Sequence, residues 1–361
     1  MTGGPTRTSS PRLAMPAITI AGRDIGAEHP PFVIAELSAN HLGSLERALA
    51  IVDAAADAGC DALKLQTFTP ASMTLDAARA DFHIADGPWQ GRSLWDLYGE
   101  AMTPWAWHAP LFAHGAARGL VVFSTPFDEH AVAQLDQLGA PAFKIASFEL
   151  VDLELIACAA ATGKPLIMST GMASDAEVQE AIDTAHRHGA GGVALLHCVS
   201  GYPTPIEQTN LRRLDAIARH GTVVGISDHS PGAIVPISAV ARGAAIIEKH
   251  LTLRRSDGGP DAGFSLEPAE MAEVVRGARQ AFAALGDGSA QRPAAEAGSR
   301  KFRRSLYAVA DIAAGQELTR SNVRAIRPGF GLAPRELPHV IGKRARAAIA
   351  RGTPLAWELM E

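Results

Sequence analysis

The chain has 361 residues, of which 47% are hydrophobic and 20% charged, and its formal net charge is −5 at pH 7. This composition is typical of a globular protein, and the acidic balance gives no electrostatic basis for binding nucleic acid or an anionic membrane surface. No apolar run approaches the roughly 18 residues that a transmembrane helix needs.

The chain begins with a polar tail, residues 1–15, which lacks the apolar core of a secretory signal peptide. Residues 16–30 alternate and turn like a β-hairpin, so we expect residues 1–31 to form a tail and hairpin ahead of the first domain. Three cysteines cannot form a closed set of disulfides, which predicts a reduced, cytoplasmic protein. They are Cys60, Cys158 and Cys198, of which Cys198 is expected to be a buried structural thiol.

The dominant pattern lies between residues 32 and 285, where short apolar runs that end in polar residues alternate with stretches of helical spacing. Such runs are typical of parallel strands buried on both faces, and the stretches between them predict helices that stop near glycine. Eight β-then-α units over about 250 residues predict an α/β fold, a (β/α)8 TIM barrel with its active site at the carboxyl ends of the strands. The predicted strands are 32–41, 62–68, 120–127, 142–149, 165–172, 193–202, 223–229 and 244–251.

A segment of different composition follows the predicted barrel. Residues 286–299 are rich in Gly, Ala, Ser and Pro, which indicates a linker. Residues 300–361 hold short alternating runs broken by Gly and Pro, and they predict a small β-rich domain. A domain of this size buries little apolar surface, so we expect it to dock onto the barrel or onto a partner subunit.

Two histidines close neighbouring strands of the predicted barrel. His229 ends the run ISDH, and His250 ends the run IEKH. Adjacent imidazoles at a strand-end layer suit a divalent metal with open coordination positions. A pair of hydrogen-bonded core histidines is the alternative, and Asp228 and Lys249 beside them favour the metal. His41, after the first strand, is either near the metal or structural.

Two lysines lie inside apolar strands, where an uncompensated ammonium is costly. Alternation directs Lys64 and Lys144 toward the barrel mouth, where an anionic substrate would supply the counter-charge. Hydroxyls at the same level would complete a site for phosphate and carboxylate groups: Thr125, Ser147, Ser169 and Ser227. A Schiff-base lysine is one alternative, and internal salt bridges to Glu36 or Glu149 are another.

Three carboxylates follow or close strands of the barrel: Glu36 in AELSAN, Glu149 in SFE and Asp261 in GPD. Each would orient a sugar hydroxyl or move a proton. Any one of them alone is equally compatible with an ordinary loop acid. Three carboxylates beside two histidines and two lysines predict an enzyme active site.

These residues stand in ordered motifs that resemble the sialic acid synthase family, enzymes that condense phosphoenolpyruvate with an N-acetylated amino sugar. The resemblance runs from about Ile18 to the C-terminus and includes an antifreeze-like (SAF) domain at residues 300–361. The branch that makes pseudaminic acid is the most similar, on the evidence of AELSANH, residues 91–108 and Ser200 in HCVSGYPTP. His197 departs from some members of that branch. The motifs are IAELSANH, KLQTF, FSTPF, FKIAS, STGM, YPTP, GISDH, EKH, GGPD and IRPGFG.

The resemblance implies a role for each matching residue. His229 and His250 would bind Mn²⁺ or Mg²⁺, which polarises the aldehyde oxygen of the open-chain sugar. Phosphoenolpyruvate would be held by Lys64, Thr125, Lys144, Ser147, Ser169 and Ser227. The sugar and the proton transfers would be served by Glu36, Gln66, Glu149, Tyr202 and Asp261. Arg327, in IRPGFG, would reach from the SAF domain of one subunit into the barrel of the other, which implies a homodimer with swapped SAF domains.

Other functions fit parts of the sequence. A metal-dependent aldolase or hydrolase would use the same barrel without a dense phosphate and carboxylate clamp. A non-catalytic carbohydrate- or ice-binding protein would use the SAF-like domain without the strand-end acids, lysines and histidines. The branch resemblance implies 2,4-diacetamido-2,4,6-trideoxy-β-L-altropyranose as the sugar. N-acetylmannosamine or 2,4-diacetamido-2,4,6-trideoxymannose, giving N-acetylneuraminate or legionaminic acid, are the alternatives.

Overall fold

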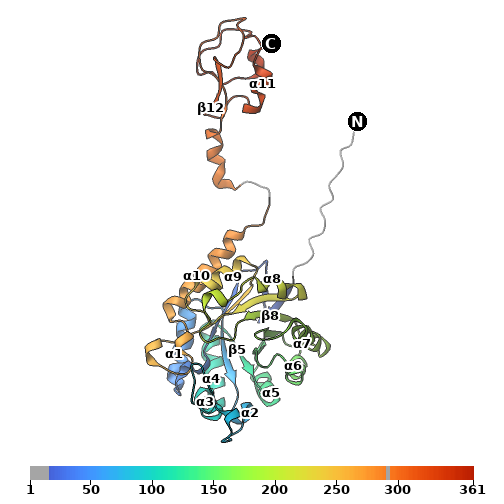
Figure 1. The fold of residues 1–361 in the computed structure, drawn as a ribbon, viewed down its shortest axis with the longest axis vertical. Helices are drawn as coiled ribbons and strands as arrows, with labels where there is room; N and C mark the ends of the chain where they lie inside the picture. Colours follow the sequence, from blue (N-terminus) through green and yellow to red (C-terminus); the bar gives the residue numbers. More distant parts are fainter. Residues whose placement is uncertain (1–15, 290–292) are drawn as a thin grey trace. The chain divides into compact units, whose positions relative to one another are not determined.

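The structure is a computed structural model that describes residues 16–289 and 293–361. The predicted tail, residues 1–15, and residues 290–292 of the predicted linker lie outside the described residues. The chain divides into two compact units, Met1–Gly286 and Asp287–Glu361, and each is described by itself. Figure 1 shows the first unit as strands surrounded by helices, and the second as a smaller unit at the C-terminal end of the chain.

Within the described residues, eight parallel strands close into a barrel in the order β10-β3-β4-β5-β6-β7-β8-β9. Every strand falls inside a run that the sequence predicts, so the (β/α)8 prediction is confirmed. The strands are β3 (Phe32–Glu36), β4 (Ala62–Thr67), β5 (Val121–Pro126), β6 (Phe143–Ile145), β7 (Leu166–Ser169), β8 (Val193–Cys198), β9 (Val223–Ser227) and β10 (Ile246–His250).

Helices follow the strands, and several begin at a side-chain cap. Ser44 accepts a hydrogen bond from the backbone of Arg47 at the start of α1, and Ser174 forms a capping box with Glu177 at the start of α7. The helices of this unit are α1 (Leu45–Asp57), α2 (Pro70–Met73), α3 (Leu94–Ala101), α4 (Trp105–Ala117), α5 (Glu129–Gln137), α6 (Leu153–Ala160), α7 (Asp175–Arg187), α8 (Arg213–Ile217), α9 (Ile234–Ala241) and α10 (Pro268–Leu285). None of the described helices is long and apolar enough to cross a membrane.

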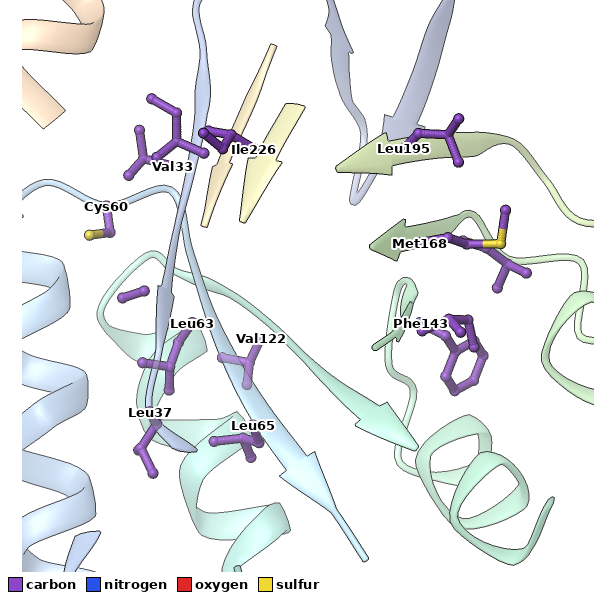
Figure 2. Packing of buried hydrophobic residues seen from close by; sticks show 14 of the residues in the cluster. Val33, Leu37, Cys60, Leu63, Leu65, Val122, Phe143, Met168, Leu195 and Ile226 are labelled. Carbon is purple, nitrogen blue, oxygen red and sulfur yellow. The ribbon is translucent and has the colours of Figure 1, made fainter. Parts of the chain in front are cut away.

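Alternation along each strand sorts its side chains into two apolar layers. One side, including Val33, Leu63 and Val122, packs against the helices, and Figure 2 shows part of this outer layer. The other side, including Phe32 and Phe123, packs inside the barrel. The predicted hairpin forms as β1 (Ala17–Ile20) and β2 (Arg23–Gly26), and its buried residues belong to the inner cluster. The amino ends of the strands therefore enclose an apolar core, and the polar inward residues lie nearer the carboxyl ends.

The second unit is built on an antiparallel pair, β11 (Ser305–Ala308) and β12 (Val323–Ile326). Short isolated bridges and the helix α11 (Leu337–Val340) complete it. Its own apolar core includes Leu306, Ile312 and Val323. The 3₁₀ helix η7 (Ala294–Phe302) begins inside the segment predicted as a linker, so residues 294–299 are helical where coil was expected.

Candidate active site

The inward side chains at the carboxyl ends of the barrel strands line a cavity that opens to solvent. Because parallel strands end at the same rim, residues far apart in the sequence meet there. Ten of the residues singled out from the sequence line it: Lys64, Gln66, Thr125, Lys144, Ser147, Ser169, Tyr202, Ser227, His229 and His250. The remaining lining residues are Phe127, Ala146, Phe148, Cys198 and Glu248.

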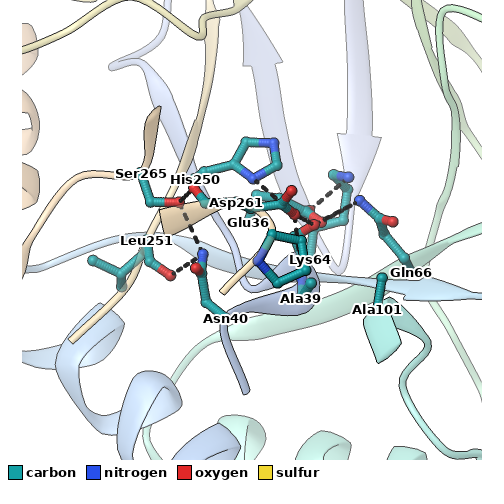
Figure 3. Close-up of polar contacts among 12 residues, drawn as sticks. Glu36, Ala39, Asn40, Lys64, Gln66, Ala101, His250, Leu251, Asp261 and Ser265 are labelled. Atoms are coloured by element: carbon teal, nitrogen blue, oxygen red, sulfur yellow. Dashed lines mark hydrogen bonds and ion pairs between the residues drawn. The ribbon is translucent and has the colours of Figure 1, made fainter. Parts of the chain in front are cut away.

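The buried Lys64 ammonium lies between two carboxylates. Glu248 lines the cavity with it, whereas Glu36, which Figure 3 shows beside Lys64, does not. Lys64 Nζ is 2.6 Å from Glu36 Oε2, 3.8 Å from Glu248 Oε2 and 3.1 Å from Thr125 Oγ1. Burial works to lower the pKa of Lys64, but the carboxylates of Glu248 and Glu36 outweigh burial and raise it. The sequence left a salt bridge between a strand lysine and Glu36 as one alternative, and the structure contains it. A lysine held in its charged form is unsuited to Schiff-base formation, which needs the free amine.

The pKa values of the two carboxylates beside Lys64 are shifted in opposite directions. Burial raises the pKa of Glu36 despite the neighbouring ammonium. Burial also works to raise the pKa of Glu248, but Lys144 and Lys64 outweigh it and lower the pKa. Gln66 Nε2 donates to Glu36 Oε1 at 3.1 Å. Glu36 is thus the member of the pair suited to carry a proton, and Glu248 the member that stays ionised.

Lys144 has no comparable partner. Its Nζ donates to Ser169 Oγ at 2.6 Å and to Ile145 O at 3.0 Å, and no ion pair of Lys144 occurs among the described residues. Burial lowers the pKa of Lys144, although Glu248 partly opposes this effect. The predicted alternative of a Lys144 to Glu149 salt bridge does not occur. A buried ammonium among hydroxyls and without a carboxylate at contact distance is suited to receive an anion.

The rings of His229 and His250 face each other with centroids 5.3 Å apart. His229 Nδ1 donates to Val199 O at 3.2 Å, which leaves the Nε2 lone pair of this tautomer available. His250 Nδ1 is buried without a hydrogen-bond partner in the described structure and lies 4.0 Å from Asp261 Oδ2. Burial, together with the nearby cations, holds the pKa of His250 well below its usual range, so its imidazole is neutral. A neutral imidazole with a free ring nitrogen is suited to bind a metal, and His250 has this form. Burial works to lower the pKa of His229, but Cys198 and the Val199 carbonyl outweigh burial and raise it, so a metal at His229 would displace a proton.

The histidine pair does not make a complete cation site by itself. Within residues 16–289 and 293–361, no group of three or more His, Cys, Asp or Glu side chains has an arrangement that would hold a metal ion. A metal held by His229 and His250 would therefore take its other ligands from water or substrate, which is the open arrangement of a catalytic metal.

Asp261 and Glu149, like Glu36, do not line this cavity. Asp261 accepts from Ser38 Oγ and, at 3.4 Å, from the backbone N–H of Ala39, and burial raises its pKa. Glu149 has one buried carboxylate oxygen without a hydrogen-bond partner in the described structure, and burial raises its pKa to about 7. Arg327 follows β12 in the second unit, where its side chain is exposed.

Three residues considered from the sequence have structural contacts instead. His41 accepts from the backbone N–H of Gly43 at 3.0 Å through Nδ1, and its Nε2 lies 3.2 Å from Ala101 O, so both ring nitrogens are occupied. Asp228 and Lys249 form a buried ion pair with each other at 3.0 Å. They face outward from the barrel and do not line the cavity, so they do not support the metal as the sequence suggested.

Sequence reasoning missed Glu248, and the expectation that Cys198 is buried is confirmed. Glu248 lines the cavity and accepts from Ser227 Oγ at 2.8 Å. Cys198 is buried, but it also lines the cavity, with its Sγ 4.0 Å from His229 Nδ1. The signal for Glu248 is strand alternation, because a residue two positions before His250 must share its face. His197, the neighbour of Cys198, points the other way, and its Nε2 lies 2.7 Å from Thr209 O.

Comparisons with known proteins agree with this geometry. The profile of the NeuB family matches residues 51–290, and the profile of the SAF domain matches residues 303–361. Pseudaminic acid synthase from Campylobacter jejuni is 42% identical over 325 residues, 90% of this chain and 95% of the relative. Pseudaminic acid synthase from Helicobacter pylori is 40% identical over 334 residues, 92% and 98% of the two chains.

A solved structure gives the same result for the fold. The N-acetylneuraminic acid synthetase of Leptospira borgpetersenii, crystallised with citrate, superposes with a TM-score of 0.71 at 31% identity, and the match covers 79% of this chain and 95% of that one.

Proposed function

Because this chain belongs to the NeuB family, we propose that it condenses phosphoenolpyruvate with 2,4-diacetamido-2,4,6-trideoxy-β-L-altropyranose and water, giving pseudaminic acid and phosphate. The resemblance to the sialic acid synthase family is thereby confirmed. The proposal is carried by 40–42% identity to two pseudaminic acid synthases over nine-tenths of the chain. The cavity supports it because it combines cations, hydroxyls, acids and two facing imidazoles.

Phosphoenolpyruvate would bind around Lys144. Among the described residues, this ammonium donates hydrogen bonds to a hydroxyl and a carbonyl oxygen and to no carboxylate. The phosphate or carboxylate of the substrate would therefore supply its counter-charge. Lys64, already paired with Glu36, adds positive potential from the neighbouring strand. The hydroxyls that supply further hydrogen bonds are Thr125, Ser147, Ser169 and Ser227.

In the reaction, the C3 carbon of phosphoenolpyruvate forms a bond with C1 of the open-chain sugar, and the aldehyde oxygen gains a proton. Water then adds at C2 and loses a proton, and the C2–O bond to phosphate breaks as the ketone forms. Glu36, with its raised pKa, is the group suited to hand over a proton. Glu248, which stays ionised, would stabilise the positive character that develops at C2.

The residues present fit a divalent metal, and enzymes of this family depend on one. His229 and His250 would hold it, since one offers a free lone pair and the other is neutral and unpartnered. When bound, the metal supplies Lewis acidity to the sugar aldehyde oxygen. Mn²⁺ and Mg²⁺ are the metals we propose. Asp261, 4.0 Å from His250, would orient that ring or a metal-bound water.

We also propose that Arg327 completes the cavity of a partner subunit in a homodimer with swapped SAF domains. Its exposed side chain has no hydrogen bond or ion pair in the part of the chain that the structure describes, and the equally exposed Phe330 follows it. A guanidinium exposed on a small loop is free to meet a polar group of the sugar.

The test of the proposed reaction is release of phosphate from phosphoenolpyruvate in the presence of the diacetamido sugar, with the organic product identified by mass and NMR. We expect release to require the sugar and the metal together. Equal turnover of N-acetylmannosamine in direct competition would contradict the assignment to the pseudaminic branch.

A further inference from the structure

Beside the polar cavity, a wall of aromatic rings extends outward from the two histidines. The Tyr202 ring lies 4.5 Å from the His229 ring, and the Phe264 ring lies 5.0 Å from the His250 ring, between centroids. Tyr202 and Phe264 are themselves 5.0 Å apart. Trp89 is the outermost ring, 5.7 Å from Tyr202 and 6.4 Å from Phe264. Tyr202 lines the cavity, and Trp89 lies beyond it, half-buried.

A short loop between the second and third helices brings Trp89 to this position. The backbone N–H of Ile84 donates to Arg92 O, and the N–H of Gly91 donates to Ile84 O, both at 2.9 Å, so the segment forms a small hairpin. Trp89 lies at its turn, where Gly87 and Gly91 take positive φ angles of 83° and 85°. The hairpin is thus ordered by its own backbone, with its one large aromatic ring directed to the cavity's edge.

The indole of Trp89 is held in place by the loop that follows β10. Its Nε1 donates a hydrogen bond to Pro260 O at 2.9 Å. The next residue, Asp261, has its Oδ2 atom 4.0 Å from His250 Nδ1. With the N–H already used, the remaining surface of the indole that meets solvent or ligand is apolar. An apolar, fixed ring at the mouth of a polar cavity is suited to an apolar part of the substrate.

The amino sugar of the proposed reaction has one such part. Its C1 aldehyde would lie at the histidines, and a six-carbon chain that begins there extends past Tyr202 toward the outer rings. The far end of that chain is C6, a methyl group in a 6-deoxy sugar. We propose that Trp89 is a specificity-determining residue that contacts the 6-methyl group, an inference that rests on the proposed function.

A positioning role is the competing explanation, because the indole N–H also holds the loop that carries Asp261. The two roles predict different kinetics. Loss of a positioning contact lowers kcat for every sugar alike, whereas loss of a methyl contact changes the ratio between sugars that differ only at C6. The conservative variant Trp89→Phe separates them further, since it keeps an apolar ring and removes the N–H.

The experiment compares kcat/KM for 2,4-diacetamido-2,4,6-trideoxy-L-altrose with that for its 6-hydroxy analogue. For Trp89→Ala we expect the preference for the 6-deoxy sugar to fall at least about tenfold, because an apolar contact discriminates against an added hydroxyl by up to about a hundredfold. Trp89→Phe should keep most of the preference. Trp105→Ala, which removes an exposed tryptophan of α4 that does not line the cavity, is the matched control and should keep the wild-type ratio.

The possible failures are distinguishable. If Trp89→Ala and Trp89→Phe both lower kcat/KM for the two sugars equally, Trp89 only positions the Asp261 loop and the inference is wrong. If the preference is unchanged in Trp89→Ala, the methyl group lies elsewhere and the inference is again wrong, while the proposed function stands. If wild-type protein turns over neither sugar with phosphoenolpyruvate, the proposed function fails and takes the inference with it.

Discussion

Replacement of Lys144 by methionine has the most sharply defined outcome of the cavity substitutions. The Lys144 Nζ has two described acceptors, Ser169 Oγ and Ile145 O, and neither carries charge. A bound anion would supply the missing counter-charge. A hydrogen bond to a charged group contributes ~1.5–3 kcal/mol, and ~1.4 kcal/mol corresponds to a tenfold change in affinity. We therefore expect Lys144→Met to bind phosphoenolpyruvate about ten- to a hundredfold more weakly than wild type.

The same substitution should leave the fold intact. Burial lowers the pKa of Lys144, so the folded chain binds this proton less well than the unfolded chain does. The charged lysine therefore destabilises the folded state at pH values below its lowered pKa. The free energy of unfolding rises as pH increases from that lowered pKa toward the ordinary lysine value. Methionine has similar length and no charge. At pH 7 the unfolding free energy of Lys144→Met should equal or exceed that of wild type.

Lys64→Met is the matched contrast, because Lys64 is equally buried but paired with Glu36 and Glu248. Removing it leaves two buried carboxylates without their nearest counter-charge, and breaking a buried pair costs about 3–5 kcal/mol. Isothermal titration with phosphoenolpyruvate and urea unfolding measure the two effects. The reasoning is refuted if Lys144→Met binds phosphoenolpyruvate like wild type, or if it loses as much unfolding free energy as Lys64→Met.

Three further outcomes follow. Burial raises the pKa of Glu149 from 4.5 to about 7, so its contribution to stability is fully present below pH 4.5 and is lost as pH rises through 7. Glu149→Gln should flatten that decline in unfolding free energy between pH 4.5 and about 7. Chelation should abolish phosphate release and metal should restore it, whereas His229→Ala/His250→Ala should show neither activity nor a metal-dependent rise in Tm; full activity in that variant would exclude the metal site. Mixing inactive Arg327→Ala and His250→Ala chains should restore about a quarter of wild-type activity if sites are shared between subunits, and none, despite proven subunit exchange, if each chain uses its own Arg327.

The barrel and most of its cavity could be predicted because period-two alternation and strand ends are local properties of the sequence. Each strand lies inside a predicted run, but β3, β6, β7 and β8 end three to five residues before the run does, because the polar residues that follow belong to loops. Lys64, Lys144, His229 and His250 all line the cavity. The same alternation also places Glu248, two residues before His250, on the inner face of the barrel. Lys249 faces outward and pairs with Asp228.

Other features depend on contacts that no local pattern specifies. The Glu36 to Lys64 pair results from the register of β3 and β4, which places these two residues opposite each other. Trp89 lies in a hairpin outside the repeating β-then-α units, and its contact with Pro260 joins residues 171 positions apart. Such pairings follow from how the whole chain closes, so no local sequence motif specifies them.

The most direct test of the central claim uses phosphoenolpyruvate labelled with ¹⁸O at the bridging oxygen, together with 2,4-diacetamido-2,4,6-trideoxy-L-altrose and metal. The account predicts that the released phosphate carries the label, because the C2–O bond breaks, and that NMR identifies the nine-carbon product as pseudaminic acid. Unlabelled phosphate, or phosphate release without a nine-carbon acid, would contradict it.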